Sequence, residues 1–418
     1  MANEVKIEER LAAYVAAIEH ELARRARSRY WGSVSRVSER VRRALLVVPR
    51  HRLLTGFYDW NKGRLPTWVP LNPDTPSLES LDQVYANTPL VIKISPDGMP
   101  VSSSSEPVLV AVMLELLQLA PGLNILEIGT GTGYNAALMA EIVGDQGRIT
   151  TLEIQADVAE CTGHLLYEAG YSNIQLHCAD GFYGWPANAP YNRIVVTTCC
   201  SDISPYWLDQ LSDKGSLLVP LMHGGKGAAP LTQVFPDGQG KVLALAGFGP
   251  AMGMLGGPGP WVEAPVPTSF PSAQGLPSQK LTRLVGEDWD VNCFLLHYHY
   301  FLALNEPNAC LFWKSGLYQV LWADQGVAFL SRNADGWIMV AGSEDLCRRV
   351  EENYKEYKEL GEPRVQDYRM EFVVRADPVE ADGSVPRVRR VGPQEWVIER
   401  RFTTQRVWLP APADAIRF

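Results

Sequence analysis

The sequence predicts an α/β fold with a parallel sheet, and two observations carry this prediction. The apolar run 124–128 has the length of a strand, and a turn with three glycines and an apolar helical pattern over 134–142 follow it. The next apolar run, 148–153, also has strand length and ends in an acid. Strand, turn and helix in this order are typical of an open α/β sheet, which binds ligands at the carboxyl ends of its strands.

The turn after the first strand carries the most specific pattern, an acid followed by glycines at every second position. Its residues are Glu127, Gly129, Thr130, Gly131, Gly133 and Tyr134. Glycine lets the backbone adopt positive φ and lets a ligand approach without a Cβ in the way. The spacing differs from the G-x-G-x-x-G of dinucleotide-binding folds, and the turn lacks the lysine of a phosphate loop. We therefore expect a cofactor that is not held through a pyrophosphate or a triphosphate.

The second acid, Glu153, lies 20 residues past Gly133 at the end of the next predicted strand. At that place a carboxylate can accept hydrogen bonds from both hydroxyls of a ribose. The alternative is an ordinary strand–helix turn with a solvated acid. The glycines and the acid agree in position, and this agreement favours a nucleoside site.

Length and composition limit the class of protein. A chain of 418 residues is too long for one compact core, so two or three domains are expected. The hydrophobic fraction of 46% and the charged fraction of 20% are typical of soluble globular proteins. The net charge of −9 argues against a general nucleic-acid binder, and no apolar run reaches membrane-spanning length. We expect neither a nucleic-acid partner nor a membrane partner.

The cysteines and the start of the chain indicate the compartment. The first ten residues lack the basic-then-apolar order of a signal peptide. Seven cysteines without framework spacing indicate a reducing cytoplasm, and without a C-x-x-C pair no zinc site is expected.

The N-terminal region predicts one long helix and then a loop. Apolar residues recur at helical spacing over 4–30, and arginines cluster from position 24 to position 43. These arginines form either a solvated helix face or a docking face for an acidic peptide. The stretch 58–80 is rich in Pro, Trp and Asn and predicts an insertion or a long loop.

Several motifs resemble known methyltransferases. The turn Glu127-x-Gly-x-Gly-x-Gly resembles the first motif of S-adenosylmethionine-dependent methyltransferases. Five ordered segments resemble the protein-L-isoaspartate O-methyltransferase family, namely 40–54 with its V-P-R-H, 85–93, 101–117, 189–200 and 205–221. The resemblance spans about Arg40 to Phe248. It implies a Rossmann-like class I fold and the cofactor S-adenosyl-L-methionine, which becomes S-adenosyl-L-homocysteine.

The same resemblance implies which residues bind the cofactor. Asp180 and Gly181 match the D-G pair that contacts the adenine amino group in the family, although a plain turn at the end of a strand is the alternative. Cys199 admits a role as a nucleophile, but packing beside the ligand is the better expectation. The expected cofactor contacts are Glu127, Gly129, Thr130, Gly131, Gly133, Tyr134, Glu153, Ile154, Asp180 and Gly181.

The serine-rich segment 101–105 is the expected acceptor site. It resembles the family segment T-I-S-A-P-H-M, which holds the substrate carboxylate, and the alignment puts Ser103 on the family threonine and Ser105 on the family serine. A carboxylate is already ionised at pH 7 and needs no general base, so neutral hydroxyls suit it. The expected catalytic residues are therefore Ser103, Ser104 and Ser105.

The helix that follows departs from the family pattern at two positions. Glu106 replaces a small residue, and Val108 replaces a histidine. Ser105 also fits the N-cap of this helix, with Pro107 in its first turn. The two departures bear on the identity of the substrate more than on the type of reaction.

Four segments are expected along the chain. They are an N-terminal helical extension (1–38), a methyltransferase domain (39–250), a Gly/Pro-rich linker (251–277) and a C-terminal α+β domain (278–418) that recognises a peptide. Strands are expected at 317–324, 326–331, 335–341 and 369–375, with a helix over 343–361. His297 and His299 would share one face of a strand, but without a third ligand packing is favoured over metal binding.

The extra domains and the two departures suggest a specialised substrate. They resemble relatives that methylate an Asp in cyclised ribosomal peptides such as lanthipeptides, lasso peptides and graspetides, where the ester collapses to aspartimide or isoaspartate. The alternative is repair of isoaspartyl residues in damaged proteins. A carboxyl methyltransferase for a small molecule and a cofactor-binding fold without activity also stay open. The expected partner is a peptide or protein that bears Asp or isoAsp.

Overall fold

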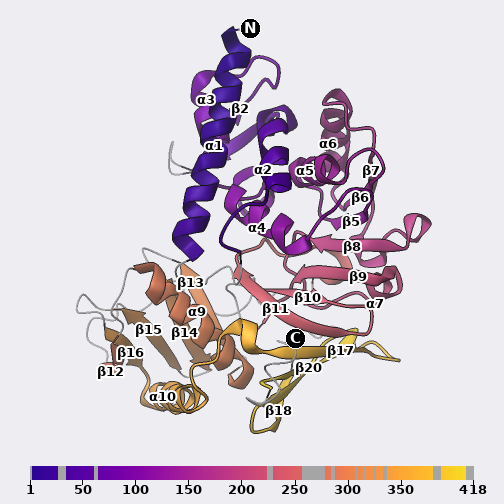
Figure 1. Cartoon of the computed structure of the whole chain (residues 1–418). Coiled ribbons are helices and arrows are strands. Elements are labelled where there is room, and N and C mark those ends of the chain that lie inside the picture. Colours follow the sequence, from indigo (N-terminus) through magenta and orange to yellow (C-terminus); the bar gives the residue numbers. More distant parts are fainter. Residues whose placement is uncertain are drawn as a thin grey trace.

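The computed structural model describes most of the chain (Figure 1). The described residues are 2–26, 34–60, 65–223, 229–256, 278–283, 288–306, 308–313, 317–323, 326–332, 337–379 and 387–410. Most of the predicted linker, 257–277, lies outside them. Among the helices of the described part, none combines the length and the apolar character needed to cross a bilayer.

An eleven-stranded sheet organises the molecule, in the order β18-β19-β20-β17-β11-β10-β9-β8-β5-β6-β7. Its strands include β5 (Asn124–Ile128), β6 (Arg148–Glu153), β7 (Ile174–Cys178), β8 (Tyr191–Val196), β9 (Leu211–Pro220), β10 (Ala229–Val234) and β11 (Gln239–Ala246). The pairs β5–β6, β5–β8, β6–β7 and β8–β9 are parallel, as the sequence predicts. Strand order reverses at β5, so the carboxyl end of β5 is the point where an open α/β sheet binds its ligand.

Helices cover this parallel sheet and follow the predicted pattern. They are α4 (Pro107–Leu117), α5 (Tyr134–Val143), α6 (Ala156–Glu168) and the short α7 (Pro205–Asp209). The 3-10 helices are η1 (Arg50–Leu53), η2 (Gly181–Tyr183), η3 (Pro186–Asn188), η4 (Gly253–Leu255) and η5 (Val365–Asp367). The predicted helix over 134–142 and the predicted strand over 148–153 are confirmed.

The N-terminal helices pack against α4 and α5, two of the helices that cover the parallel sheet. Helix α1 (Ala2–Ala26) contacts α2 (Glu39–Val47) and α4 (Figure 1). Its apolar stripe is buried and consists of Leu11, Tyr14, Val15, Ile18 and Leu22. The amphipathic helix predicted over 4–30 is therefore confirmed up to Ala26, and residues 27–30 lie outside the described residues.

The stretch 58–80 was predicted to be an insertion or a long loop; the long loop is wrong, and the insertion stays a prediction. A four-stranded sheet in the order β2-β1-β3-β4 begins there, with β1 (Gly56–Asp59), β2 (Thr67–Pro70), β3 (Leu90–Ile94) and β4 (Pro100–Ser104), and α3 (Leu78–Val84) lies between β2 and β3. Strands of four residues show too few alternations for a period to be visible in the sequence.

The C-terminal region begins with a five-stranded sheet in the order β12-β16-β15-β14-β13. Its elements are β12 (Ser278–Arg283), α9 (Asp288–Asn305), β13 (Ala309–Trp313), β14 (Leu317–Ala323), β15 (Gly326–Arg332), β16 (Trp337–Gly342) and α10 (Glu344–Glu359). His297 and His299 lie on helix α9, so the strand considered for them is wrong. Helix α9 contacts β13, β14 and α10 as well as β18, and a helix buried on several sides shows no polar stripe.

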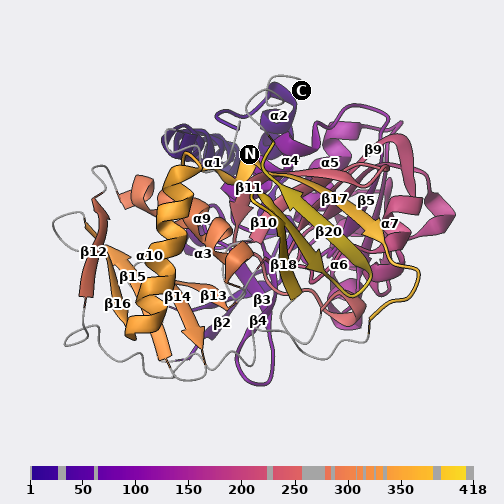
Figure 2. The same ribbon diagram turned by 90° about the horizontal axis from the view of Figure 1, so that it is seen from below.

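The last strands do not belong to the five-stranded sheet. Strands β17 (Arg369–Val374), β18 (Arg387–Gly392), β19 (Glu395–Glu399) and β20 (Thr403–Trp408) extend the central sheet, because β17 pairs with β11 (Figure 2). Buried Asp202 also accepts hydrogen bonds from Phe402 N at 2.6 Å and Thr403 N at 3.0 Å. Strands β17–β20 therefore share a sheet with the methyltransferase part, and buried residues of the five-stranded sheet share its hydrophobic core. The predicted domain boundaries stay a prediction.

Candidate active site

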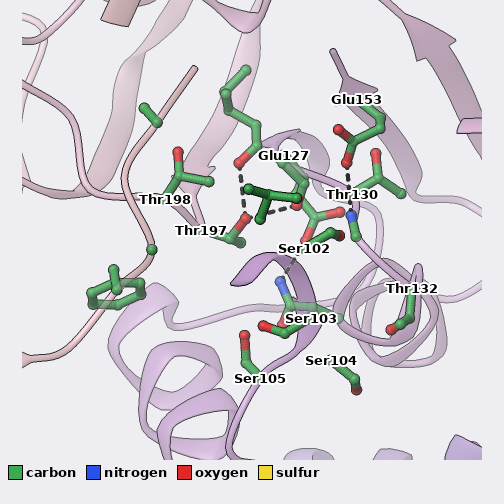
Figure 3. Close-up of a pocket in the computed structure, with 18 of the residues that line it drawn as sticks. Ser102, Ser103, Ser104, Ser105, Glu127, Thr130, Thr132, Glu153, Thr197 and Thr198 are labelled. Atoms are coloured by element: carbon green, nitrogen blue, oxygen red, sulfur yellow. Dashed lines mark hydrogen bonds between the residues drawn. The ribbon is translucent and has the colours of Figure 1, made fainter. Parts of the chain in front are cut away.

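A cavity of about 570 Å³ opens at the carboxyl ends of β5 and β6 (Figure 3). Three stretches supply much of its wall: the glycine turn, the serine segment and residues 246–252. All of the predicted site residues line this cavity except Gly133. A Cβ at Gly133 would lie 2.9 Å from Thr162 Cγ2 of α6, so this glycine serves the packing of turn against helix.

The glycine turn brings the cofactor side of the cavity against the serine segment. Gly129 has φ +94° and Gly131 has φ +54°, values that L side chains rarely adopt. A Cβ at Gly131 would lie 3.0 Å from the carbonyl oxygen of Ser103, and a Cβ at Gly129 would lie 2.5 Å from Thr197 Oγ1. Both glycines are therefore required by conformation and by space.

The carboxylate of Glu153 is fixed by the backbone at the end of β6. Its Oε2 accepts a hydrogen bond from Gly131 N at 3.0 Å, and its Oε1 accepts one from Gln155 N at 3.0 Å. A carboxylate has about four lone-pair sites, so further donors can still bind to it. This arrangement suits the ribose-binding acid that the sequence predicts.

Glu127 is completely buried and ties three elements together. Its Oε1 accepts a hydrogen bond from Asn135 Nδ2 at 2.7 Å, and its Oε2 accepts one from Thr151 Oγ1 at 2.7 Å. Burial raises the pKa of Glu127 to about 7, although these two hydrogen bonds act in the opposite direction. This carboxyl therefore joins β5, α5 and β6, and it also lines the cavity, so the direct cofactor contact expected of it stays a prediction.

Asp180 connects the cofactor side to the segment after β11. Its Oδ1 accepts a hydrogen bond from Phe182 N at 3.0 Å, and its Oδ2 accepts one from Met254 N at 3.0 Å. Met254 belongs to η4, at the end of the segment 246–255.

The segment 246–255 forms one wall of the cavity, and the sequence did not predict this role. The backbone of Cys199 holds the segment on both sides, by Cys199 N to Gly249 O at 2.7 Å and by Ala251 N to Cys199 O at 2.8 Å. Residues 251–256, which the sequence assigned to a linker, are thus ordered by contacts with the methyltransferase part. The Gly and Pro content of the segment led to its assignment as a linker. In the structure Gly253 packs closely against Asp180, because it has φ +66° and a Cβ there would lie 2.3 Å from Asp180 Oδ2.

The three predicted catalytic serines do not have equivalent positions. Ser103 pairs with Val91 and Ser104 with Leu90 across β3 and β4, so successive side chains point to opposite faces. The side chain of Ser104 is buried, and its Oγ accepts a hydrogen bond from Arg50 Nε at 3.0 Å. In Figure 3 its hydroxyl points away from Glu127 and Glu153. We therefore expect Ser103 and Ser105 to contact an acceptor and Ser104 to support the segment.

Arg50 is a site-supporting residue that the sequence analysis did not single out, although it lies in the V-P-R-H motif. Its guanidinium is fully buried and donates to Val84 O at 2.9 Å, Ser104 O at 3.1 Å and Ser105 O at 2.9 Å. Buried hydrogen bonds from an ionised donor are short and strong. Arg50 therefore fixes the backbone that carries the serine hydroxyls.

The N-cap predicted at Ser105 is wrong. The N-cap of α4 is Glu106, whose side chain makes no capping hydrogen bond, while Pro107 occupies the first turn as predicted. In the part of the chain that the structure describes, the Ser105 hydroxyl makes no hydrogen bond, so it is available to a ligand.

Helix α1 contributes two residues that the sequence analysis did not assign to this site. Arg25 lines the cavity, and Tyr14 OH lies 3.3 Å from Tyr134 OH at the start of α5. No local signal in the sequence marks these residues, because their partners lie far along the chain.

Cys199 packs in the wall behind the cavity. It is 2% exposed, and burial raises the pKa of its thiol to about 12. A nucleophilic cysteine needs its thiolate form near neutral pH, so the environment disfavours that role.

Comparisons with known proteins agree with this geometry. The family described as protein-L-isoaspartate(D-aspartate) O-methyltransferase (PCMT) matches residues 76–244. A protein-L-isoaspartate O-methyltransferase of Methanococcoides burtonii is 38% identical over 162 residues, which are 39% of this chain and 75% of the relative. One of Methanosarcina mazei is 35% identical over 206 residues, which are 49% of this chain and 72% of the relative.

A solved structure of a protein-L-isoaspartate O-methyltransferase covers 85% of this chain and 95% of its own, with 22% identity and a TM-score of 0.48. The two archaeal relatives carry the assignment, because each exceeds 30% identity over more than two thirds of its own length. The chain therefore belongs to the protein-L-isoaspartate(D-aspartate) O-methyltransferase family and is an S-adenosylmethionine-dependent carboxyl O-methyltransferase.

Proposed function

We propose that this enzyme methylates the carboxylate of L-isoaspartyl residues in proteins or peptides. The observation that carries the proposal is the contact between the two sides of the cavity. The glycine turn, which belongs to the cofactor side, approaches the Ser103 carbonyl so closely that a Cβ at Gly131 would lie 3.0 Å from it. The family relatives are named for this acceptor, and the serine segment lies at the place where the acceptor would meet the cofactor.

The residues on the cofactor side fit S-adenosylmethionine. Glu153 would receive the ribose hydroxyls, the turn 129–131 would lie along the amino-acid part, and Asp180 with the wall 246–255 would border the adenine. When bound, S-adenosylmethionine supplies an electrophilic methyl group, and S-adenosylhomocysteine is the product. The cavity volume of about 570 Å³ lies within the range of pockets that bind small molecules.

The residues on the acceptor side would orient a carboxylate without taking a proton from it. The described residues that line the cavity include no histidine and no lysine, and an ionised carboxylate needs no general base. The hydroxyls of Ser103 and Ser105 would donate hydrogen bonds to one carboxylate oxygen and direct the other toward the methyl group. Alignment of this kind is worth about 7–11 kcal/mol of the barrier.

Intact-mass measurement of the acceptor tests this proposal. The enzyme is incubated with S-adenosylmethionine and a linear isoaspartyl peptide, and the control is the same peptide with a normal Asp. We expect one added methyl group on the isoaspartyl peptide and none on the control. An unmodified isoaspartyl peptide, with an enzyme that still binds the cofactor, would refute the proposal.

A second candidate substrate is a normal Asp in a cyclised ribosomal peptide. The observation in its favour is that elements outside the matched residues 76–244 lie on or beside the methyltransferase part, among them Arg25 at the cavity and β17–β20 in the central sheet. Residues 278–418 would then grip the peptide. The expected result is a gain of one methyl group followed by net loss of water, as the ester collapses to aspartimide and releases methanol. Turnover of the linear peptide alone would exclude this candidate.

A further inference from the structure

The acceptor end of the cavity contains an ion pair between distant segments. Arg25, in the last turn of α1, lines the cavity and donates from Nη2 to Glu106 Oε1 at 2.9 Å. The side chains are 13% and 23% exposed. The two residues are 81 positions apart in the chain, and Arg25 precedes the residues that the family match covers.

A second contact also holds the Glu106 carboxylate in place. Its Oε1 also accepts a hydrogen bond from Asn87 Nδ2 at 3.0 Å, and Asn87 Oδ1 in turn accepts one from Val108 N at 3.1 Å. The Glu106 carboxylate therefore binds Arg25 and Asn87 and does not cap the N-terminus of α4. Its position directly after Ser105 puts a negative charge next to the hydroxyls that would bind the acceptor.

Glu21 also pairs with Arg25, on the face of α1 next to this ion pair. Arg25 also donates from Nε to Glu21 Oε1 at 2.5 Å, and Glu21 accepts a further hydrogen bond from Arg24 Nη2 at 2.7 Å. Removal of the Arg25 charge would leave the Glu106 carboxylate without this arginine beside the acceptor site, and like charges at short range in a partly desolvated cleft repel strongly.

We infer that Arg25 is a positioning residue for the acceptor, which neutralises Glu106 so that an anionic carboxylate can bind beside Ser105. The inference rests on the proposed function, because it assigns helix α1 to the substrate site of the same reaction. It also explains how the chain carries a glutamate in this segment: the compensating charge comes from α1.

The alternative is that the pair only attaches α1 to the rest of the molecule. The apolar stripe of α1 is already buried against its neighbours, and Tyr14, Ile18 and Leu22 are at most 2% exposed. A purely structural role predicts that loss of either partner has the same effect. Charge neutralisation predicts instead that loss of Glu106 cancels the effect of losing Arg25.

Steady-state kinetics with an isoaspartyl peptide separate these two roles. The proteins are the full-length wild type, Arg25→Met, which retains an unbranched apolar stem, Glu106→Gln and the double variant Arg25→Met/Glu106→Gln. We expect Arg25→Met to raise KM for the peptide by about 10-fold or more, with the dissociation constant of S-adenosylmethionine within about twofold of wild type. The double variant should return KM to within about threefold of wild type.

Two further variants control for the fold and for the charge. Arg25→Lys retains the charge and should stay within about threefold of the wild-type KM. Arg24→Ala removes a more exposed arginine that pairs with Glu21 in the same turn and does not line the cavity, so it should leave KM unchanged. Thermal unfolding identifies any variant that fails to fold. Should Arg25→Met be one of these, the comparison of Arg25→Lys with the double variant replaces it, and both are then expected near the wild-type KM.

The inference is overturned when Arg25→Met leaves KM unchanged, or when the double variant is no better than Arg25→Met. Failure of the proposed function looks different, since the wild type would then methylate no isoaspartyl peptide. In that case the same proteins are compared on a cyclised Asp peptide, because the inference concerns any carboxylate acceptor. A wild type that methylates neither peptide would overturn both statements.

Discussion

The two ends of the cavity are built in different ways. The cofactor end comes largely from one continuous stretch, because Glu127, the glycine turn and Glu153 lie within 27 positions of one another. The acceptor end is assembled from α1, η1, β4 and the start of α4. Its main side-chain contacts join residues that lie 54 positions apart, for Arg50 and Ser104, and 81 positions apart, for Arg25 and Glu106.

This difference separates the residues for methyl transfer from the residues for acceptor specificity. At the cofactor end, backbone N–H groups hold the acid Glu153, and such contacts allow few side-chain changes. At the acceptor end, pairs of side chains define the surface, so a matched change of two residues can alter the charge there without moving the cofactor turn. The structure thus allows acceptor specificity to change while the methyl-transfer site is retained.

The largest expected effect comes from filling the space at the cofactor turn. Gly129→Ala puts a Cβ about 2.5 Å from Thr197 Oγ1 at a residue with φ +94°. Backbone strain and overpacking each cost on the order of 1–3 kcal/mol, so the turn must shift and the affinity for S-adenosylmethionine should fall about 1000-fold. Isothermal titration of the cofactor measures the loss.

Gly122→Ala is the matched control for this variant. Gly122 has φ +80°, but a Cβ there would meet nothing within 4 Å. The control therefore has the unfavourable φ without the clash, and its cofactor affinity should match that of the wild type. Equal loss in the two variants would mean that the contact between Gly129 and Thr197 does not shape the cofactor site.

The second prediction concerns pH and the buried acid at the cofactor end. The pKa of Glu127 is about 7 in the folded protein and 4.5 in the unfolded chain, so the folded state binds the proton more tightly. Stability contributed by this group is therefore present below pH 4.5 and is lost as the pH rises to 7. The loss amounts to about 3 kcal/mol.

Urea unfolding of the apo enzyme at several pH values measures this loss. Glu127→Gln cannot titrate and is close in shape to a protonated glutamate, so the two proteins should have similar stability near pH 4. At pH 8 the variant should exceed the wild type by about 3 kcal/mol. Parallel stability profiles from pH 4 to 8 would contradict the raised pKa.

The sequence predicts the strands and the turn at the cofactor end because their signal is local. Strand β5, its glycine turn and α5 follow one another, and the acid at the end of β6 falls at the expected spacing. No such signal exists for the pairing of β11 with β17, where Gln239 is opposite Glu371. The C-terminal strands consequently looked like part of a separate domain, although they extend the central sheet.

The acceptor end shows the limit of residue-by-residue interpretation. Positions 103, 104 and 105 are all serine, so the sequence alone does not distinguish them. The pairing of β4 with β3 directs the side chain of Ser104 toward Arg50. Arg25 looked like one member of a solvated arginine-rich face. Its partner Glu106 was recognised as a departure from the family pattern, but a single sequence does not reveal a contact between residues 81 positions apart.

The third prediction distinguishes the serines at the acceptor end. Ser105→Ala removes a hydroxyl that is available in the cavity, and a hydrogen bond to an ionised carboxylate is worth about 1.5–3 kcal/mol. We expect kcat/KM for the peptide to fall about 10-fold or more, with cofactor affinity nearly unchanged and unfolding unaltered. Kinetics, cofactor titration and urea unfolding give the three values.

Ser104→Ala provides the contrast within the same strand. The lost hydroxyl accepts from buried Arg50, so the free energy of unfolding should fall by about 1–2 kcal/mol. An unfolding free energy equal to that of the wild type would mean that the Arg50 contact does not stabilise the segment. Loss of cofactor affinity in Ser105→Ala would mean that the two ends of the cavity are not separable at this serine.

The smallest expected effect tests the contact of α1 with the cofactor end. Tyr14 OH lies 3.3 Å from Tyr134 OH, and both rings are 2% exposed. Tyr14→Phe leaves the Tyr134 hydroxyl without this partner, so the free energy of unfolding should fall by about 1 kcal/mol. Tyr167→Phe is the control, because Tyr167 is 79% exposed and its hydroxyl contributes little.

Because the apolar stripe still attaches α1, Tyr14→Phe should leave KM for the peptide unchanged, in contrast to Arg25→Met. A raised KM in Tyr14→Phe would mean that α1 acts on the acceptor through its position as a whole rather than through the charge of Arg25.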